Sequence, residues 1–170
     1  MGTRILLAAA SIGAAAFTTA ALTVPAAVAD RGRPETGARE TVLVASLKGA
    51  NEVPVKGGPA VGDKDGMALE FVRLKGDKVS VTARWDRVGK PIMLHIHQGA
   101  KGVNGAIKVD FTKLLRTAHQ HRVTGTVTVR DRALLRRIAA DPGGFYANLH
   151  TAEFPGGAVR GQLHRVHTGK

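Results

Sequence analysis

The chain of 170 residues contains no cysteine. It therefore has no disulfide bonds, no thiolate nucleophile and no thiolate ligand for a soft metal ion. Serine is also scarce, because Ser46 and Ser80 are the only serines beyond Ser11. Neither a Gly-x-Ser-x-Gly elbow nor a phosphate-binding loop is present. These absences argue against cysteine and serine catalysis, and no residue pattern predicts an enzyme.

Aromatic residues account for 4% of the chain, and 25 Lys and Arg residues outnumber 13 acidic ones. The formal net charge is +12. Such a charge favours contact with polyanions, so anionic polymers of the cell surface are one predicted partner and an extracellular protein is another. The alternative interpretation is that the charge serves solubility alone. The few aromatic residues offer no stacking platform for bases, which argues against a specific nucleic-acid interaction.

Only one long apolar run occurs, and it lies at the start of the chain. Arg4 supplies a positive charge, an uncharged Ala-rich stretch follows, and Ala27-Val28-Ala29 ends the segment. These features predict a cleavable secretory signal over residues 1–29, with a retained membrane anchor as the alternative. No other apolar run reaches spanning length. We therefore expect a secreted, extracellular protein with no membrane span after signal cleavage.

Short runs of β-branched residues, separated by Gly, Asp and Pro, dominate the rest of the chain. Residues 30–40 are charged and contain Gly and Pro, which predicts a linker, and the β-rich pattern then extends over residues 41–166. The runs predict eight strands, at Thr41–Leu47, Met67–Leu74, Lys78–Asp86, Pro91–His97, Ala106–Phe111, Arg122–Arg130, Phe145–Thr151 and Val159–His164.

One short helix is predicted late in the chain. Asp131 is suited to cap its N-terminus, and Asp141-Pro142-Gly143-Gly144 ends it. Arg132, Arg136 and Arg137 lie off the apolar stripe of this helix, so we expect them to face solvent. Short strands in an antiparallel order with one brief helix predict an all-β fold, either a Greek-key β-sandwich or a flattened barrel of about eight strands.

Three histidines are candidate metal ligands. His95 and His97 are two residues apart in a predicted strand, so both imidazoles lie on one face with Cα atoms about 6.6 Å apart. His150 lies in a second predicted strand, and three imidazoles converge if the two strands are neighbours. Three neutral nitrogens suit copper or zinc. In the alternative interpretation, the histidines only tie the loop at 99–105 and the turn at 153–157 to the sheet by hydrogen bonds.

Other polar residues have simpler predicted roles. Asn51 is suited to an Asx-type turn in which its side chain bonds its own backbone. Arg160 is expected to form a structural ion pair with Glu153, Glu52 or Asp86. His119 and His121 are expected to contact solvent, whereas His164 and His167, near the polar C-terminal end, carry little information.

Four sequence strings resemble the chordin-domain (CHRD) family, in its secreted bacterial single-domain form. They are Leu47-Lys-Gly-Ala-Asn-Glu-Val-Pro54, His95-Ile-His97-Gln-Gly99, Phe145-Tyr-Ala-Asn-Leu-His-Thr151 and Pro155-Gly-Gly-Ala-Val-Arg-Gly-Gln-Leu163. The resemblance covers residues 42 to 165. It implies an extracellular β-domain that acts as a binding or structural module without an assigned activity.

The His-x-His strand on a predicted Greek-key fold is also similar to that of copper-zinc superoxide dismutases. The similarity is remote, because no histidine between His97 and Phe111 is available as a bridging ligand and the cysteine pair of those enzymes is absent. An extracellular copper- or zinc-binding protein is therefore the alternative to a metal-free binding module.

Overall fold

The computed structural model describes residues 40–166, so the predicted signal at 1–29 and all but the last residue of the predicted linker lie outside the described residues. Nine strands form one antiparallel sheet in the order β5-β4-β7-β8-β1-β2-β3-β6, and β9 pairs with β1. No helix within residues 40–166 is long and apolar enough to cross a membrane. The strands are β1 (Thr41–Lys48), β2 (Met67–Lys75), β3 (Lys78–Asp86), β4 (Pro91–Gln98), β5 (Ile107–Asp110), β6 (Arg122–Thr128), β7 (Phe145–Thr151), β8 (Val159–Gln162) and β9 (His164–Arg165).

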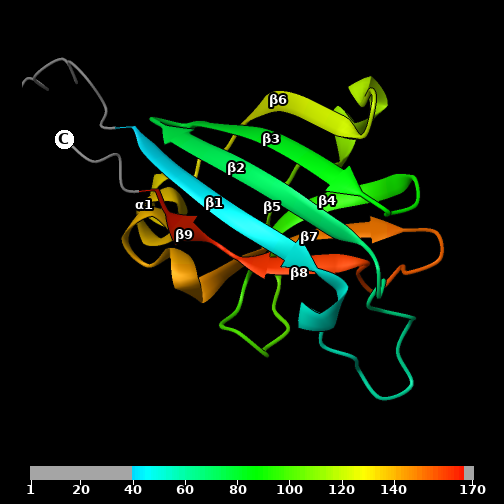
Figure 1. Cartoon of the computed structure of the whole chain (residues 1–170). Coiled ribbons are helices and arrows are strands. Elements are labelled where there is room, and N and C mark those ends of the chain that lie inside the picture. The colour runs from blue at the N-terminus through cyan, green and yellow to red at the C-terminus, as the bar shows by residue number, and fades with distance from the viewer. Residues whose placement is uncertain (1–39, 167–170) are drawn as a thin grey trace, which may run out of the picture. The chain divides into compact units, whose positions relative to one another are not determined.

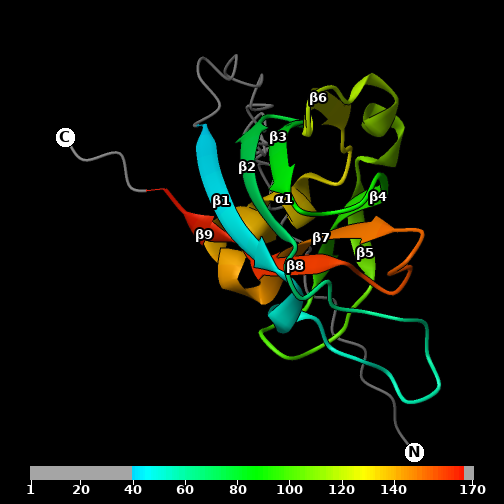
Figure 2. The same cartoon turned by 45° about the vertical axis from the view of Figure 1, so that its right-hand side comes forward.

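The sheet curls strongly, so that its two halves face each other across one core (Figures 1 and 2). One half consists of β1, β2, β3 and β6, and the other consists of β8, β7, β4 and β5. The 3-10 helix η2 (Thr112–Thr117) contacts both β4 and β6 and so links the two halves. The predicted all-β antiparallel fold with one short helix is confirmed.

The predicted helix is also confirmed, as α1 (Arg132–Ala140). The Asp131 carboxylate accepts a hydrogen bond of 2.8 Å from the backbone nitrogen of Leu134, which satisfies one of the free donors at the helix N-terminus. Its apolar stripe packs into the core, whereas the three arginines off this stripe are exposed. A single 3-10 turn, η3 (Pro142–Gly144), follows and leads into β7.

The last predicted strand is divided into two. After β8, Leu163 is fully buried and its backbone nitrogen donates to Phe145 on β7. The next strand, β9, continues along β1, where it lies opposite Leu43 and Val44, whereas β8 lies between β7 and β1. The interruption at Leu163 explains why the structure has nine strands and the sequence predicted eight. A second short element, η1 (Gly49–Asn51), ends β1.

Strand alternation places an acidic side chain in the core. On β2 every second residue is buried, and Glu70 is one of them, with no exposed surface. Its strand neighbours in register are the small residues Ala45 and Ala83. Neither carboxyl oxygen has a hydrogen-bond partner, and burial raises the pKa of Glu70 to about 8.

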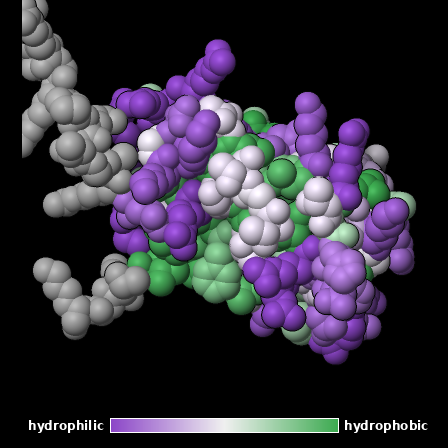
Figure 3. All heavy atoms as spheres, turned by 90° about the horizontal axis from the view of Figure 1, so that it is seen from above, coloured by the Kyte–Doolittle hydropathy of each residue, from purple (hydrophilic) through white to green (hydrophobic). Residues whose placement is uncertain are grey.

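The outer face of β3 and β6 is polar. Ser80 and Thr82 on β3 form side-chain hydrogen bonds with Thr126 and Thr124 on β6, at 2.8 and 3.2 Å. Figure 3 shows one side of the molecule, where hydrophilic side chains project around a paler, partly hydrophobic area. A sheet with one apolar and one polar face is the usual product of antiparallel strands with alternating residues.

Candidate metal centre

The pairing of β4 with β7 brings the three candidate histidines to one sheet face. In the register, Met93 lies opposite His150, and His95 lies opposite Asn148. Leu94 and Ile96, which alternate with the histidines, point into the core and are fully buried. All three histidines are buried too, because loops cover this outer face of the sheet. The predicted condition for convergence, that the two strands are neighbours, is therefore met.

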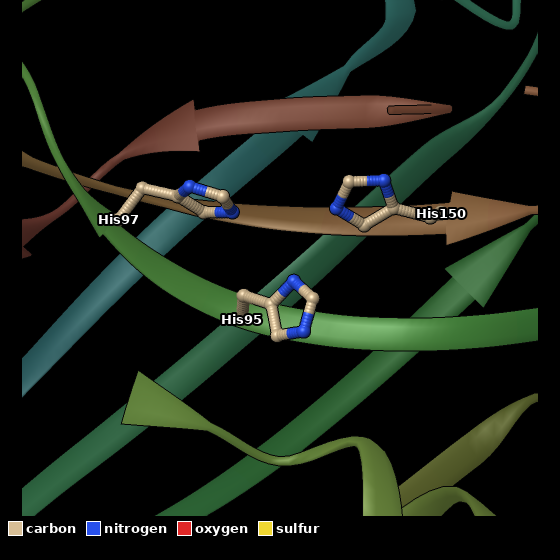
Figure 4. A group of neighbouring side chains, drawn as sticks. All are labelled: His95, His97 and His150. Carbon is tan, nitrogen blue, oxygen red and sulfur yellow. The ribbon is translucent and has the colours of Figure 1, made fainter. Parts of the chain in front are cut away.

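The three imidazoles surround a common point (Figure 4). The ring centroid of His95 lies 5.4 Å from that of His97 and 5.3 Å from that of His150. The centroids of His97 and His150 are 6.2 Å apart. One nitrogen from each ring lies within 4.8 Å of the other two. In the figure, one nitrogen of each ring points toward the centre of the group.

The other nitrogen of each ring is held by the surrounding protein. His97 Nδ1 donates to the carbonyl oxygen of Gly105 at 2.9 Å, and His150 Nδ1 donates to that of Pro155 at 3.0 Å. Since a carbonyl can only accept, these bonds place the proton on Nδ1 and leave the lone pair of Nε2 free. The histidines do tie the loop and the turn to the sheet, as the alternative interpretation predicted.

His95 has the opposite arrangement. Its Nε2 lies 3.2 Å from the Thr112 hydroxyl and 3.5 Å from the Asp110 carboxylate. Because an ionised carboxylate can only accept a hydrogen bond, Nε2 carries the proton. The free lone pair is then on Nδ1. The three inward nitrogens are therefore Nδ1 of His95 and Nε2 of His97 and His150, and none of them has a hydrogen-bond partner in the described part of the chain.

Burial keeps the cluster uncharged at neutral pH. It lowers the pKa of His95 to about 4, with a further contribution from His150, and it lowers the pKa of His97 and His150 as well. Although burial acts to raise the pKa of Asp110, hydrogen bonds from Thr112 hold it below its ordinary value. The site thus presents three neutral nitrogen lone pairs beside one ionised carboxylate.

The His97 ring is part of a stack of three planar groups, which continues with the Tyr146 ring and the Arg160 guanidinium. The Tyr146 ring lies parallel to the His97 ring, with centroids 4.8 Å apart and an interplanar angle of 7°. The Arg160 guanidinium lies 3.4 Å from the centroid of the same tyrosine ring. It also donates to the carbonyls of Ala100 and Val103, at 3.1 and 2.7 Å. Arg160 therefore fastens the loop whose Gly105 carbonyl orients His97.

Among residues 40–166, Arg160 forms no direct ion pair with Glu153, Glu52 or Asp86, although its charge and that of Glu52 act on each other at longer range. The loop at 99–105 folds over the guanidinium and supplies neutral acceptors, including the Asn104 side chain at 3.0 Å. The sequence pattern around Arg160 does not indicate that a loop distant in the sequence covers this residue.

The predicted Asx turn at Asn51 is replaced by a longer contact. The Asn51 amide donates to the backbone oxygen of Arg160 at 2.9 Å, which attaches η1 to β8. The next residue, Glu52, is directed toward β7, where Asn148 Nδ2 donates to both of its carboxyl oxygens at 3.2 Å. Burial raises the pKa of Glu52 to about 7, although Arg160 and Asn148 act to lower it.

The sequence analysis did not identify four residues around the histidines, which are Asp110, Thr112, Tyr146 and Asn148. It also did not predict the buried contact between Glu52 and Asn148. Alternation along β7 could have found Tyr146 and Asn148, because both share the face of His150. His119 and His121 are exposed, as expected, and the His121 ring stacks on the Trp85 ring with centroids 6.3 Å apart. His164 is exposed as well, whereas His167 lies outside the described residues.

Comparison with known proteins identifies the family. A family model described as the CHRD domain matches residues 43–163. The chain belongs to the CHRD-domain family. No curated protein and no solved structure matches the chain. In this CHRD domain the four strings that carry the resemblance meet at one place, because they supply Glu52, the histidines of β4 and β7, and Arg160.

Proposed function

We propose that this CHRD domain binds one copper or zinc ion through Nδ1 of His95 and Nε2 of His97 and His150. The observation that carries the proposal is that three buried nitrogen acceptors, each without a partner, lie within 4.8 Å of one another. A nitrogen ligand binds either ion at about 2 Å, so a bound metal would draw the three inward nitrogens closer together.

The hydrogen bonds to the loops do not by themselves account for the arrangement. His97 and His150 each use only one ring nitrogen to tie Gly105 and Pro155 to the sheet. The second nitrogen then costs about 1–3 kcal/mol if it is buried without a partner, and the cluster holds three such atoms. A bound cation removes this cost. The outer bonds are those that metal-ligating histidines ordinarily make to carbonyls and carboxylates, which fix the ring orientation.

The donor set favours copper or zinc over other ions. Three imidazoles with no oxygen ligand are unsuited to calcium or magnesium, which prefer oxygen. Among divalent ions of the first transition series, Cu²⁺ binds such sites most tightly. We therefore expect Cu²⁺ to bind more tightly than Zn²⁺. Three protein ligands leave at least one coordination position for an exogenous ligand.

We further propose that the protein acts outside the cytoplasm, as an exported metal-binding module. The proposal rests on the pattern of residues 1–29, with its charged start, apolar middle and Ala-x-Ala end. Dismutase activity is not part of the proposal, because no fourth histidine joins the cluster in the described residues.

The test is the metal content of protein purified without a tag, loaded with Cu²⁺ or Zn²⁺ and then desalted. We expect close to one ion per chain for the wild-type protein and for His121→Ala, which removes an exposed histidine outside the cluster. We expect His97→Ala to retain almost none. A wild-type protein without stoichiometric metal, or an equal loss in both variants, would falsify the proposal.

A further inference from the structure

We propose that Asn148 selects the exogenous ligand of this centre and favours a neutral hydrogen-bond donor, such as water or ammonia, over an anion. The inference rests on the proposed metal site and adds the chemical class of the ligand that completes it. Within residues 40–166, the buried side-chain atoms without a hydrogen-bond partner are the two Glu70 oxygens, the three inward imidazole nitrogens and Oδ1 of Asn148.

Asn148 lies in the same cluster as the histidines. On β7 it stands between Tyr146 and His150 on one face, and on β4 it lies directly opposite His95. Residues directly opposite in an antiparallel pair have Cβ atoms about 4.5–5.5 Å apart. Asn148 is 3% exposed and His95 is 4% exposed. The unsatisfied amide oxygen therefore belongs to the surroundings of the three nitrogens rather than to a separate site.

Glu52 decides which end of the amide is available. Asn148 Nδ2 donates to both carboxyl oxygens of Glu52, and above the pKa of this group, about 7, the ionised carboxylate accepts only from the nitrogen end. Oδ1 is thereby left as the free end. Room for the Glu52 carboxyl depends on Gly157, where a Cβ atom would lie 2.6 Å from Glu52 Oε1. The orientation of Asn148 is thus determined by residues from two distant segments.

The four unpartnered atoms of the cluster, three imidazole nitrogens and the Asn148 amide oxygen, are all hydrogen-bond acceptors. Three lone pairs on the imidazoles suit a cation, and the fourth acceptor is suited to a proton of whatever molecule binds that cation. Water or ammonia supplies such a proton. Azide has no proton to donate and brings negative charge toward the amide oxygen. A buried hydrogen bond changes affinity by up to about tenfold.

The experiment compares ammonia with azide as ligands of the copper-loaded full chain at about pH 8.5, where Glu52 is ionised. Binding is followed by the visible copper absorption and by electron paramagnetic resonance. The measured quantity is the ratio of the two affinities, which cancels general changes in the acidity of the copper ion. We expect Asn148→Leu to keep one copper ion and to lower the ammonia-to-azide ratio about tenfold. Glu52→Gln should lower the ratio too, because glutamine can donate as well as accept and no longer fixes the amide.

Gln120→Leu is the control, because it removes an exposed amide in the loop before β6, outside the histidine cluster. Its ratio should equal that of the wild-type protein. Asn148→Ala replaces Asn148→Leu if circular dichroism shows that the leucine variant does not fold. An unchanged ratio in the copper-loaded Asn148 variant overturns the inference and leaves the metal site intact. A wild-type chain that binds no copper overturns both.

Discussion

Replacing Glu70 with methionine is expected to stabilise the protein at neutral pH and to remove a steady loss of stability between pH 5 and 8. The Glu70 side chain has no exposed surface and no hydrogen-bond partner for either oxygen. Its register neighbours, Ala45 and Ala83, offer no charge and no donor group. Methionine has a similar length and shape, is apolar and adapts well to irregular core space.

The magnitude follows from the pKa of the carboxyl group. Burial raises the pKa of Glu70 from its ordinary 4.5 to about 8, so the folded protein keeps a proton that the unfolded chain has already lost. The associated stability is fully present below pH 4.5 and is lost as the pH rises toward 8. Each pH unit in this window costs about 1.4 kcal/mol, which amounts to about 3 kcal/mol at pH 7.

Urea unfolding at pH 5, 6, 7 and 8, in the presence of a chelator, measures the effect. The difference in unfolding free energy between Glu70→Met and the wild-type protein should widen by about 1.4 kcal/mol per pH unit. Glu70→Gln should also lack the pH-dependent loss but should be less stable than Glu70→Met, because its amide remains unpartnered. Parallel pH curves for the wild-type protein and Glu70→Met would refute the idea that Glu70 is buried in its protonated form.

Two further predictions concern the metal-free protein. Burial lowers the pKa of His95 to about 4, so its contribution to stability is present above pH 6.5 and is lost as the pH falls. The stability difference between the wild-type protein and His95→Leu should shift by about 2 kcal/mol between pH 7.5 and 5 in urea unfolding, and a constant difference would contradict this. Gly161→Ala should destabilise the protein by about 2 kcal/mol, because the added Cβ would lie 2.3 Å from the backbone oxygen of Ser46. Gly89→Ala, whose Cβ would lie 3.8 Å from its nearest neighbour, should stay within about 0.5 kcal/mol of the wild-type protein in thermal unfolding, and equal effects of the two variants would contradict the steric argument.

Local patterns predicted the elements of this fold well. The alternation of Val79 to Trp85 gave a strand with one buried face, and Asp131 capped the helix that its position suggested. The same alternation predicted that His95 and His97 share a face. These predictions succeed because the period of a strand and the free donors of a helix terminus are local properties of the chain.

Predictions of contacts between distant side chains were less successful. Arg160 and Asn51 were assigned local or charged partners, but their hydrogen bonds go to backbone carbonyls brought in by the loop at 99–105 and by the packing of η1 on β8. The buried position of Glu70 was not predicted at all. Such contacts depend on the path of loops, and neither residue type nor spacing specifies that path.

By itself, the sequence determined a cysteine-free, basic chain with short antiparallel strands, one capped helix and two histidines on a common strand face. Only the tertiary structure decided that β4 and β7 are neighbours, although 46 residues separate Gln98 from Phe145, and that the third imidazole joins the first two. The physical reason is that strand pairing is a non-local choice, made by the burial of the whole sheet and not by the residues that meet at the site. The direction of each free lone pair was decided later still, by the carbonyls, hydroxyl and carboxylate that hold the outer nitrogens.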